Sequence, residues 1–203
     1  MPKAHGLLAD ENAFIRSQHE QAFLEIQTRA LAAAADPDYG LVMIHWPIPH
    51  PPGMYHRFEH RLASDSRAHY LDNLELADET LGEVRHAMET AGVWDDSIVL
   101  ITGDHGFRPF IWKNLVDWDA EDSQAGALVT RNRVPFLVKM PRQVDAITYD
   151  DHFNTILVRD LFTAMMNGEV HTASQVGSWI HTWGSAHGLD KETQNRGAHL
   201  PLH

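Results

Sequence analysis

The chain has 203 residues, of which 28 are acidic and 16 basic, and its formal net charge is −12. This charge argues against nucleic acid and against an anionic membrane surface as partners. The sequence contains no cysteine, so it offers no disulfide, thiolate zinc ligand or cysteine nucleophile, and oxygen and imidazole must hold any metal. We expect no membrane span, because no stretch approaches the about 20 apolar residues that one needs.

The first predicted element is a long amphipathic helix over residues 11–35. Its apolar residues recur at helical spacing, and Asp36-Pro37 ends the pattern. These residues are Phe23, Ile26, Ala30 and Ala33. The next run, "YGLVMIHW" at 39–46, is short, apolar and partly β-branched, which predicts a buried strand. The loop that follows, 47–60, is expected to be irregular and stiff because it is rich in proline.

A second helix is predicted between Ser66 and Ala91, where one face is apolar and Gly92 supplies a stop. The expected apolar face consists of Tyr70, Leu74, Ala77, Leu81, Val84, Met88 and Ala91. Two further strands are predicted at 97–103 ("SIVLITG") and 133–140 ("RVPFLVKM"), with a long acidic loop between them.

The last elements are helices, expected over 150–168 and 173–183. Three buried strands separated by helices imply the α/β class, with a parallel or mostly parallel sheet covered on both faces. The sequence shows no internal repeat and no low-complexity linker. We therefore expect one α/β domain over residues 1–184, followed by a polar tail over 185–203.

Two candidate metal ligands, Asp104 and His105, follow the strand predicted at 97–103. Open α/β sheets bind ligands beyond the carboxyl ends of their strands. In a regular strand the two side chains would face opposite ways, but Gly103 and Gly106 make a bend plausible. The pair would suit zinc, or manganese with further oxygen ligands. A loop in which Asp104 caps a turn and His105 bonds locally also fits the tripeptide, so both interpretations stay open.

The strand predicted at 39–46 delivers His45 and, through the proline-rich loop, His50. If the two strands are neighbours, these histidines converge with the Asp-His pair. His50 fits a donor to a substrate oxyanion, and it also fits a loop histidine that bonds to backbone. Arg108 is a candidate for binding phosphate or sulfate, and a surface ion pair would explain it as well.

Other polar residues receive no functional role. The acidic segment "VDWDAED" at 116–122 resembles a cation trap, but we interpret it as a solvated loop. We expect Asp72, Asp78 and His86 on the solvated side or flank of their helix.

Four segments, taken in order, carry a resemblance to a known family. They are "LVMIHWPIPHPP", "YLDNLELADETLGEVRHAMETAGVWDDSIVLITGDHG", "RVPFLVKMP" and "FNTILVRDLFTAMMNGEV". Together they resemble the C-terminal half of sulfatase-like proteins of the alkaline phosphatase superfamily, and the resemblance extends over residues 39–183. It implies a three-layer α/β/α sandwich, of which this chain would form the C-terminal part.

In that family, one or two divalent cations lie at the strand ends, and the enzymes cleave or transfer phosphate or sulfate esters. By position, Asp104 and His105 match the family's metal-ligand pair from this half, and His50 matches a histidine that contacts phosphoryl or sulfuryl oxygens. The resemblance implies zinc or manganese rather than calcium, and a small-molecule or lipid-like ester as substrate. His45 and Arg108 are candidate substrate-binding residues.

The family's other acidic metal ligand and its nucleophile come from an N-terminal half that this sequence does not include. Three interpretations stay open: a C-terminal part of a hydrolase or transferase that is inactive alone, an enzyme completed by another chain or by Ser123 or Thr130, and a non-catalytic binding module. A half sheet leaves an edge unpaired, which predicts a homodimer or association with the missing half. Location stays open, because related proteins often work outside the cytoplasm and no address is present here.

Overall fold

The computed structural model describes residues 5–62, 68–113, 118–129 and 133–189. Packing divides the chain into two compact units. The larger unit extends to Trp94 and also includes Thr102–Phe136, and the smaller unit consists of Asp95–Ile101 and the chain from Leu137 onward.

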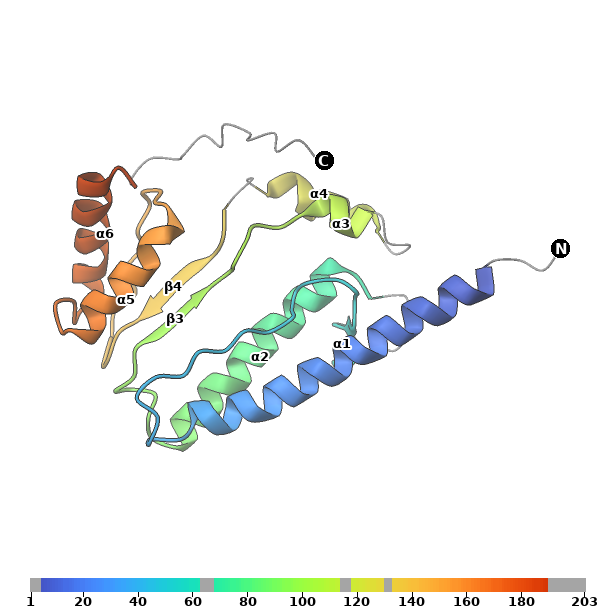
Figure 1. Ribbon diagram of the computed structural model, residues 1–203, viewed down its shortest axis with the longest axis horizontal. Coiled ribbons are helices and arrows are strands. Elements are labelled where there is room, and N and C mark those ends of the chain that lie inside the picture. Colours follow the sequence, from blue (N-terminus) through green and yellow to red (C-terminus); the bar gives the residue numbers. More distant parts are fainter. Residues whose placement is uncertain (1–4, 63–67, 114–117, 130–132, 190–203) are drawn as a thin grey trace, which may run out of the picture. The chain divides into compact units, whose positions relative to one another are not determined.

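Two long helices form the frame of the larger unit. Helix α1 (His5–Ala34) and helix α2 (Tyr70–Thr90) pack side by side, as Figure 1 shows, and both confirm the helices predicted from apolar spacing. Their core joins Phe23 of α1 to Leu76 of α2 and to Met54 and Tyr55 of the proline-rich loop. Trp46, Ile48 and Leu62 pack against this cluster.

The buried stripe of α2 differs from the predicted one. Its buried residues are Asp72, Asn73, Leu76, Thr80, Val84 and Met88. Val84 and Met88 belong to the predicted face, whereas Leu74 is 44% exposed. The stripe is rotated because two polar residues occupy core positions: Thr80 donates its hydroxyl to the Leu76 carbonyl oxygen at 2.6 Å, and Asn73 binds loop backbone. The expected solvated position of Asp72 is therefore wrong, since that residue is only 6% exposed.

The predicted strand at 39–46 is wrong in one respect, because none of these residues belongs to a strand in the described chain. Burial nevertheless alternates along the segment: Leu41, Met43 and His45 are exposed, while the residues between them are half-buried. That period of two is typical of extended backbone with one covered side. The segment thus has the side-chain pattern of a strand without a ladder partner among the described residues.

The loop after this segment contains a small hairpin that was not expected. Strand β1 (Tyr55–His56) pairs antiparallel with β2 (Arg61–Leu62), with Tyr55 opposite Leu62 and His56 opposite Arg61. The remainder of the loop is irregular, as predicted.

The second sheet consists of β3 (Val99–Thr102) and β4 (Phe136–Lys139), which confirms both strands predicted in this part of the chain. The two run antiparallel, so the expected mostly parallel sheet is not observed in the described residues. The α/β class holds at the coarse level. The acidic stretch between the strands is not one long loop, because it contains helices α3 (Pro109–Lys113) and α4 (Ala120–Leu128).

In the smaller unit, a 3-10 turn η1 (Thr155–Leu157) leads into α5 (Val158–Met166), and α6 (Ala173–His187) packs against α5. Leu157, Leu161 and Ile180 are almost fully buried in this unit. Helix α6 begins with the Thr172 hydroxyl accepting from the Gln175 N–H, and it ends at Gly188, whose φ of 67° favours glycine. Among the described residues, no helix combines the length and apolar character that crossing a membrane requires.

Candidate functional site

Asp104 and His105 lie in a bend directly after β3, as the flanking glycines predicted. Asp104 Oδ1 is 3.9 Å from His105 Nε2, so the two side chains lie on the same side of the chain. The side chain of Asp104 is 69% exposed and that of His105 is 35% exposed. Two ligands of one zinc ion at about 2.1 Å and a tetrahedral angle are about 3.4 Å apart. A small rotation of the exposed carboxylate would therefore bring the pair to ligand geometry.

The tautomer of His105 follows from its local hydrogen bond. Its Nδ1 lies 2.9 Å from the Gly106 carbonyl oxygen, which can only accept. Nδ1 must therefore carry a proton, and in the neutral ring the lone pair available to a metal is on Nε2, which lies 3.9 Å from Asp104 Oδ1. A backbone carbonyl that fixes the far nitrogen is the arrangement usual for metal-binding histidines. The donor set thus fits a divalent cation.

His50 is oriented by the loop that carries it. Its Nδ1 donates to the Pro51 carbonyl oxygen at 2.8 Å, which leaves Nε2 open at an exposed side chain. Its own carbonyl oxygen accepts from Asn73 Nδ2 at 3.1 Å. The ring of His19 in α1 lies nearly parallel at a centroid distance of 6.3 Å. His19 was not identified from the sequence, because it is 31 positions away and belongs to an ordinary helical pattern.

The structure brings Asp104 and His105 together, but no bond in the described chain joins them to His50, His45 or Arg108. Within the described chain, no hydrogen bond or ion pair joins His50 to Asp104 or His105, and these three do not form a tight ligand group. His45 is exposed in the extended segment. Arg108 is also exposed, and its guanidinium forms no ion pair with a described residue, so it is available to an anion.

Aromatic packing fixes the chain just after the bend. Phe107 stacks on Tyr70 of α2 at 3.8 Å between ring centroids, and it lies 6.3 Å from Trp118. Trp112 meets Tyr70 edge-on at 5.7 Å. The exposed Asp-His bend is therefore attached to a packed aromatic group, which restricts where its side chains can point.

A second cluster of metal-ligand type lies beside these aromatic residues. His69, Asp119 and Asp122 each offer one ligand atom, and these atoms all lie within 4.8 Å of one another. His69 Nδ1 is 3.1 Å from Asp122 Oδ2, and His69 Nε2 is 4.0 Å from Asp119 Oδ2. Sequence analysis missed this group because its members come from the starts of two helices 50 positions apart.

The local structure of this cluster is set by helix capping. Asp119 is the N-cap of α4, and its Oδ1 accepts from the Asp122 N–H at 2.8 Å. The backbone N–H of His69 donates to Asp72 at the start of α2 at 2.7 Å. The interpretation of 116–122 as a solvated loop is wrong for Asp122, which is only 1% exposed. Burial raises the pKa of the Asp122 carboxyl above its ordinary value, against the opposing effect of bonds to Asp119 and His69.

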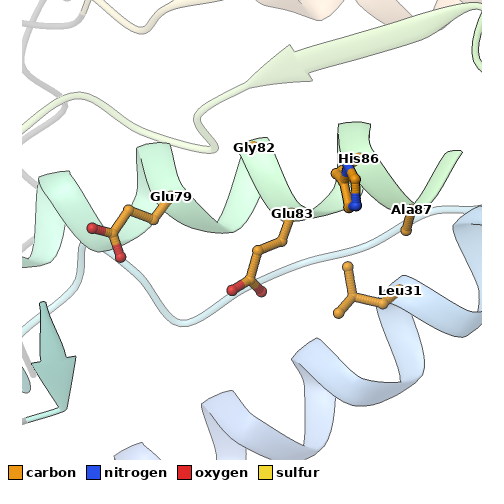
Figure 2. Close-up of a pocket in the computed structure, with 6 residues that line it drawn as sticks. All are labelled: Leu31, Glu79, Gly82, Glu83, His86 and Ala87. Carbon is orange, nitrogen blue, oxygen red and sulfur yellow. The ribbon is translucent and has the colours of Figure 1, made fainter. Parts of the chain in front are cut away.

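A shallow hollow between α1 and α2 is a weaker candidate. Figure 2 shows Leu31 of α1 next to His86 and Ala87 of α2, with Glu83 and then Glu79 farther along the same helix. The acidic groups there already have partners: Glu83 accepts from Gln27 Nε2 at 2.6 Å, and Glu79 accepts from the Tyr55 hydroxyl. None of the predicted site residues lines this hollow.

Comparison with known proteins identifies the family. The family model described as Sulfatase matches residues 16–167, which is more than half of the chain. No curated protein and no solved structure shows significant similarity to it. The matched region includes the proline-rich loop, α2, and the bend with Asp104 and His105. The chain therefore belongs to the sulfatase family.

Proposed function

We propose that this chain forms part of a metal-dependent enzyme that hydrolyses or transfers phosphate or sulfate esters. Asp104 and His105 would be ligands of zinc or manganese, and His50 would contact the oxygens of the ester group. Membership of the sulfatase family supports a hydrolase of such esters. The single observation that carries the site assignment is the fixed tautomer of His105, whose Nε2 faces Asp104 Oδ1 at 3.9 Å.

The bound cation would polarise the ester oxygens and activate a nucleophile. The chain's own groups have separate tasks. His50 would donate from its imidazolium form or accept at Nε2, because Nδ1 is held by Pro51. The guanidinium of Arg108, which forms no ion pair with a described residue, would bind two oxygens of the anionic group.

The nucleophile is proposed to come from outside this sequence. Ser123 is poorly suited to the role, because its hydroxyl donates to the Asp119 carbonyl oxygen and accepts from Trp118 Nε1, both at 2.8 Å. Thr130 lies outside the described residues. A partner would therefore complete the site, either a polypeptide that carries the N-terminal half of the fold or a second copy of the chain.

The experiment compares this chain with a longer protein in which the N-terminal half of a sulfatase fold precedes it in one polypeptide. An aryl sulfate and an aryl phosphodiester serve as substrates, with Zn²⁺ or Mn²⁺ added. We expect turnover by the longer protein only, and its loss on Asp104→Asn. Asp78→Asn is the matched control, since Asp78 is an exposed aspartate of α2 outside the site.

Two results would contradict the proposal. Turnover by the 203-residue chain alone would place a nucleophile within it. An inactive longer protein that binds no metal through Asp104 would instead support a non-catalytic binding module.

A further inference from the structure

We propose that His69, Asp119 and Asp122 bind a second divalent cation, of the zinc or manganese type, at the start of helices α2 and α4. This site is separate from Asp104 and His105 and does not depend on the function proposed above. Its three ligand atoms come from an imidazole and two carboxylates and lie within 4.8 Å of one another.

The observation that points to a ligand is an unpaired oxygen on Asp122. The Asp122 side chain is 1% exposed, yet its Oδ1 is buried without any hydrogen-bond partner among the described residues. A buried carboxylate oxygen without a partner is unfavourable unless a cation or a proton satisfies it. His69 meets only the other oxygen, Oδ2, at 3.1 Å.

Arg57 binds to Glu121, the residue before Asp122, but forms no ion pair with Asp122 in the part of the chain that the structure describes. Its Nε is 3.5 Å from Asp72 Oδ1 without forming a hydrogen bond among the described residues, and its terminal nitrogen bonds to Glu121. The carboxylates of Asp72 and Glu121 therefore take up the charge of this guanidinium. Among the described residues, the Asp122 carboxylate meets only the His69 imidazole and the Asp119 N–H, both at Oδ2. In a chain with a net charge of −12, a bound cation would offset this local excess of negative charge.

The ligand chemistry fits a borderline metal. One imidazole nitrogen and two carboxylates are a common three-ligand set for zinc, with water in the fourth position, and manganese accepts the same groups with more oxygen. Asp119 can adapt, since its side chain is 47% exposed and only its Oδ1 is used in capping. Asp122 and His69 already lie at a separation close to the about 3.4 Å expected for two tetrahedral zinc ligands.

The site would also fix the neighbouring aromatic residues. Tyr70 follows His69 directly, Trp118 precedes Asp119 directly, and both rings lie against Phe107. A cation that joins the two helix starts would hold this aromatic group together. Phe107 in turn follows the bend with Asp104 and His105 by two positions. The second cation would therefore act as a structural ion beneath the candidate active site.

The test uses the chain with Asp104→Asn and His105→Gln, so that the first site contributes nothing. Mn²⁺ alone is titrated and its free form is counted by electron paramagnetic resonance, followed by competition with Zn²⁺. We expect one equivalent of Mn²⁺ to bind and Zn²⁺ to displace it. Adding Asp122→Asn or His69→Gln should weaken binding at least about 10-fold. Adding Asp78→Asn, on an exposed part of α2, should leave binding unchanged.

Thermal unfolding distinguishes a variant that no longer binds metal from a variant that no longer folds. Without metal, Asp122→Asn should melt at the same or a higher temperature, because it removes a buried charge while keeping the shape. With Mn²⁺, the melting temperature of the parent should rise and that of the Asp122→Asn variant should not. The proposal would be overturned if Mn²⁺ did not bind to the Asp104→Asn, His105→Gln parent, or if neither Asp122→Asn nor His69→Gln weakened the binding. Since Asp104 and His105 are absent throughout, either proposal can fail without the other.

Discussion

The side-chain amide of Asn73 in α2 donates to the backbone carbonyl oxygen of His50 at 3.1 Å, so a core residue holds the loop that carries the candidate substrate-contacting histidine. The same amide nitrogen donates to the Pro52 carbonyl oxygen at 3.0 Å, and Asn73 Oδ1 accepts from the Met54 N–H at 2.9 Å. Asn73 is 0% exposed. Proline residues cannot supply N–H donors to order this loop, and the asparagine provides the contacts that a strand neighbour would otherwise provide.

Asn73→Ala should lower the free energy of unfolding by about 2–4 kcal/mol, because it leaves buried backbone groups of the loop without partners. Urea unfolding measures this loss. Leu74→Ala is the matched control on the next position of the helix, and we expect it to cost less than about 1 kcal/mol, since Leu74 is 44% exposed. Equal losses in the two variants would show that the hydrogen bonds to the loop contribute little.

Asn73 also explains why the buried face of α2 could be predicted only in part. Apolar spacing located the helix, since Val84 and Met88 are buried as expected. It could not locate the rotation of the helix near its start, because there the core is made by Asn73 and Thr80 with their hydrogen bonds satisfied. Polar residues can occupy a core when other segments supply their hydrogen-bond partners. The apolar periodicity of one segment contains no information about those partners.

The candidate sites show the same division. The bend at Asp104 and His105 is local and is encoded by adjacent glycines, so the sequence predicted it. The cluster of His69 with Asp119 and Asp122 depends on the packing of two helix starts. In the sequence, an acidic segment with one buried carboxylate has the same pattern as an acidic segment that is fully exposed to solvent. The strand at 39–46 was predicted from its apolar alternation, which the structure retains, but pairing requires a neighbour that a single run cannot specify.

Gly53 should tolerate no side chain. A Cβ at this position would lie 2.0 Å from the Ala68 carbonyl oxygen, so the loop and the start of α2 could not approach as closely. Gly53→Ala should destabilise the protein by at least about 2 kcal/mol in urea unfolding. Gly82 is the control, because a Cβ there meets nothing within 4 Å and the residue lies inside α2. Gly82→Ala should stabilise by about 0.5–1 kcal/mol, and a similar loss in both variants would contradict this explanation.

The Glu79 carboxylate should make the free energy of unfolding depend on pH. The hydrogen bond from the Tyr55 hydroxyl and the contact with His60 Nδ1 at 2.7 Å lower the pKa of the Glu79 carboxyl, against the opposing effect of burial. A lowered pKa in the folded state means that the stabilisation is complete above the unfolded value of about 4.3. It is lost as the pH falls through the folded value.

Glu79→Gln should therefore destabilise the protein at pH 6, and the difference from the wild type should shrink as the pH falls below about 4. Urea unfolding between these pH values measures the difference. Glu75→Gln is the control, because Glu75 is an exposed neighbour on the same helix and should show no such dependence. A wild-type advantage that stays constant down to pH 3 would contradict the assignment to the Glu79 carboxylate.

The exposed side of the segment at 39–46 should drive association. Leu41 is 57% exposed and Met43 is 91% exposed, and they alternate along an extended backbone that has no ladder partner in the described chain. Extended apolar segments with free N–H and C=O groups pair readily with other strands. Sedimentation velocity over a concentration series should show dimers or larger species that increase with concentration. The double variant Leu41→Lys and Met43→Lys should shift this distribution toward the monomer, because pairing would bury two charges.

Val144→Lys distinguishes this explanation from a general effect of surface hydrophobicity. Val144 is 92% exposed, as exposed as Met43, but it lies in an irregular stretch of the smaller unit rather than in an alternating extended segment. If strand-like pairing is responsible, the lysine at position 144 should leave the association unchanged. A wild-type chain that remains monomeric at the highest concentration reached would contradict association through this segment. Equal loss of association in the Val144 variant would assign it to unspecific apolar contact, since Val144 and Met43 are exposed to the same degree but only Met43 lies on an alternating extended segment.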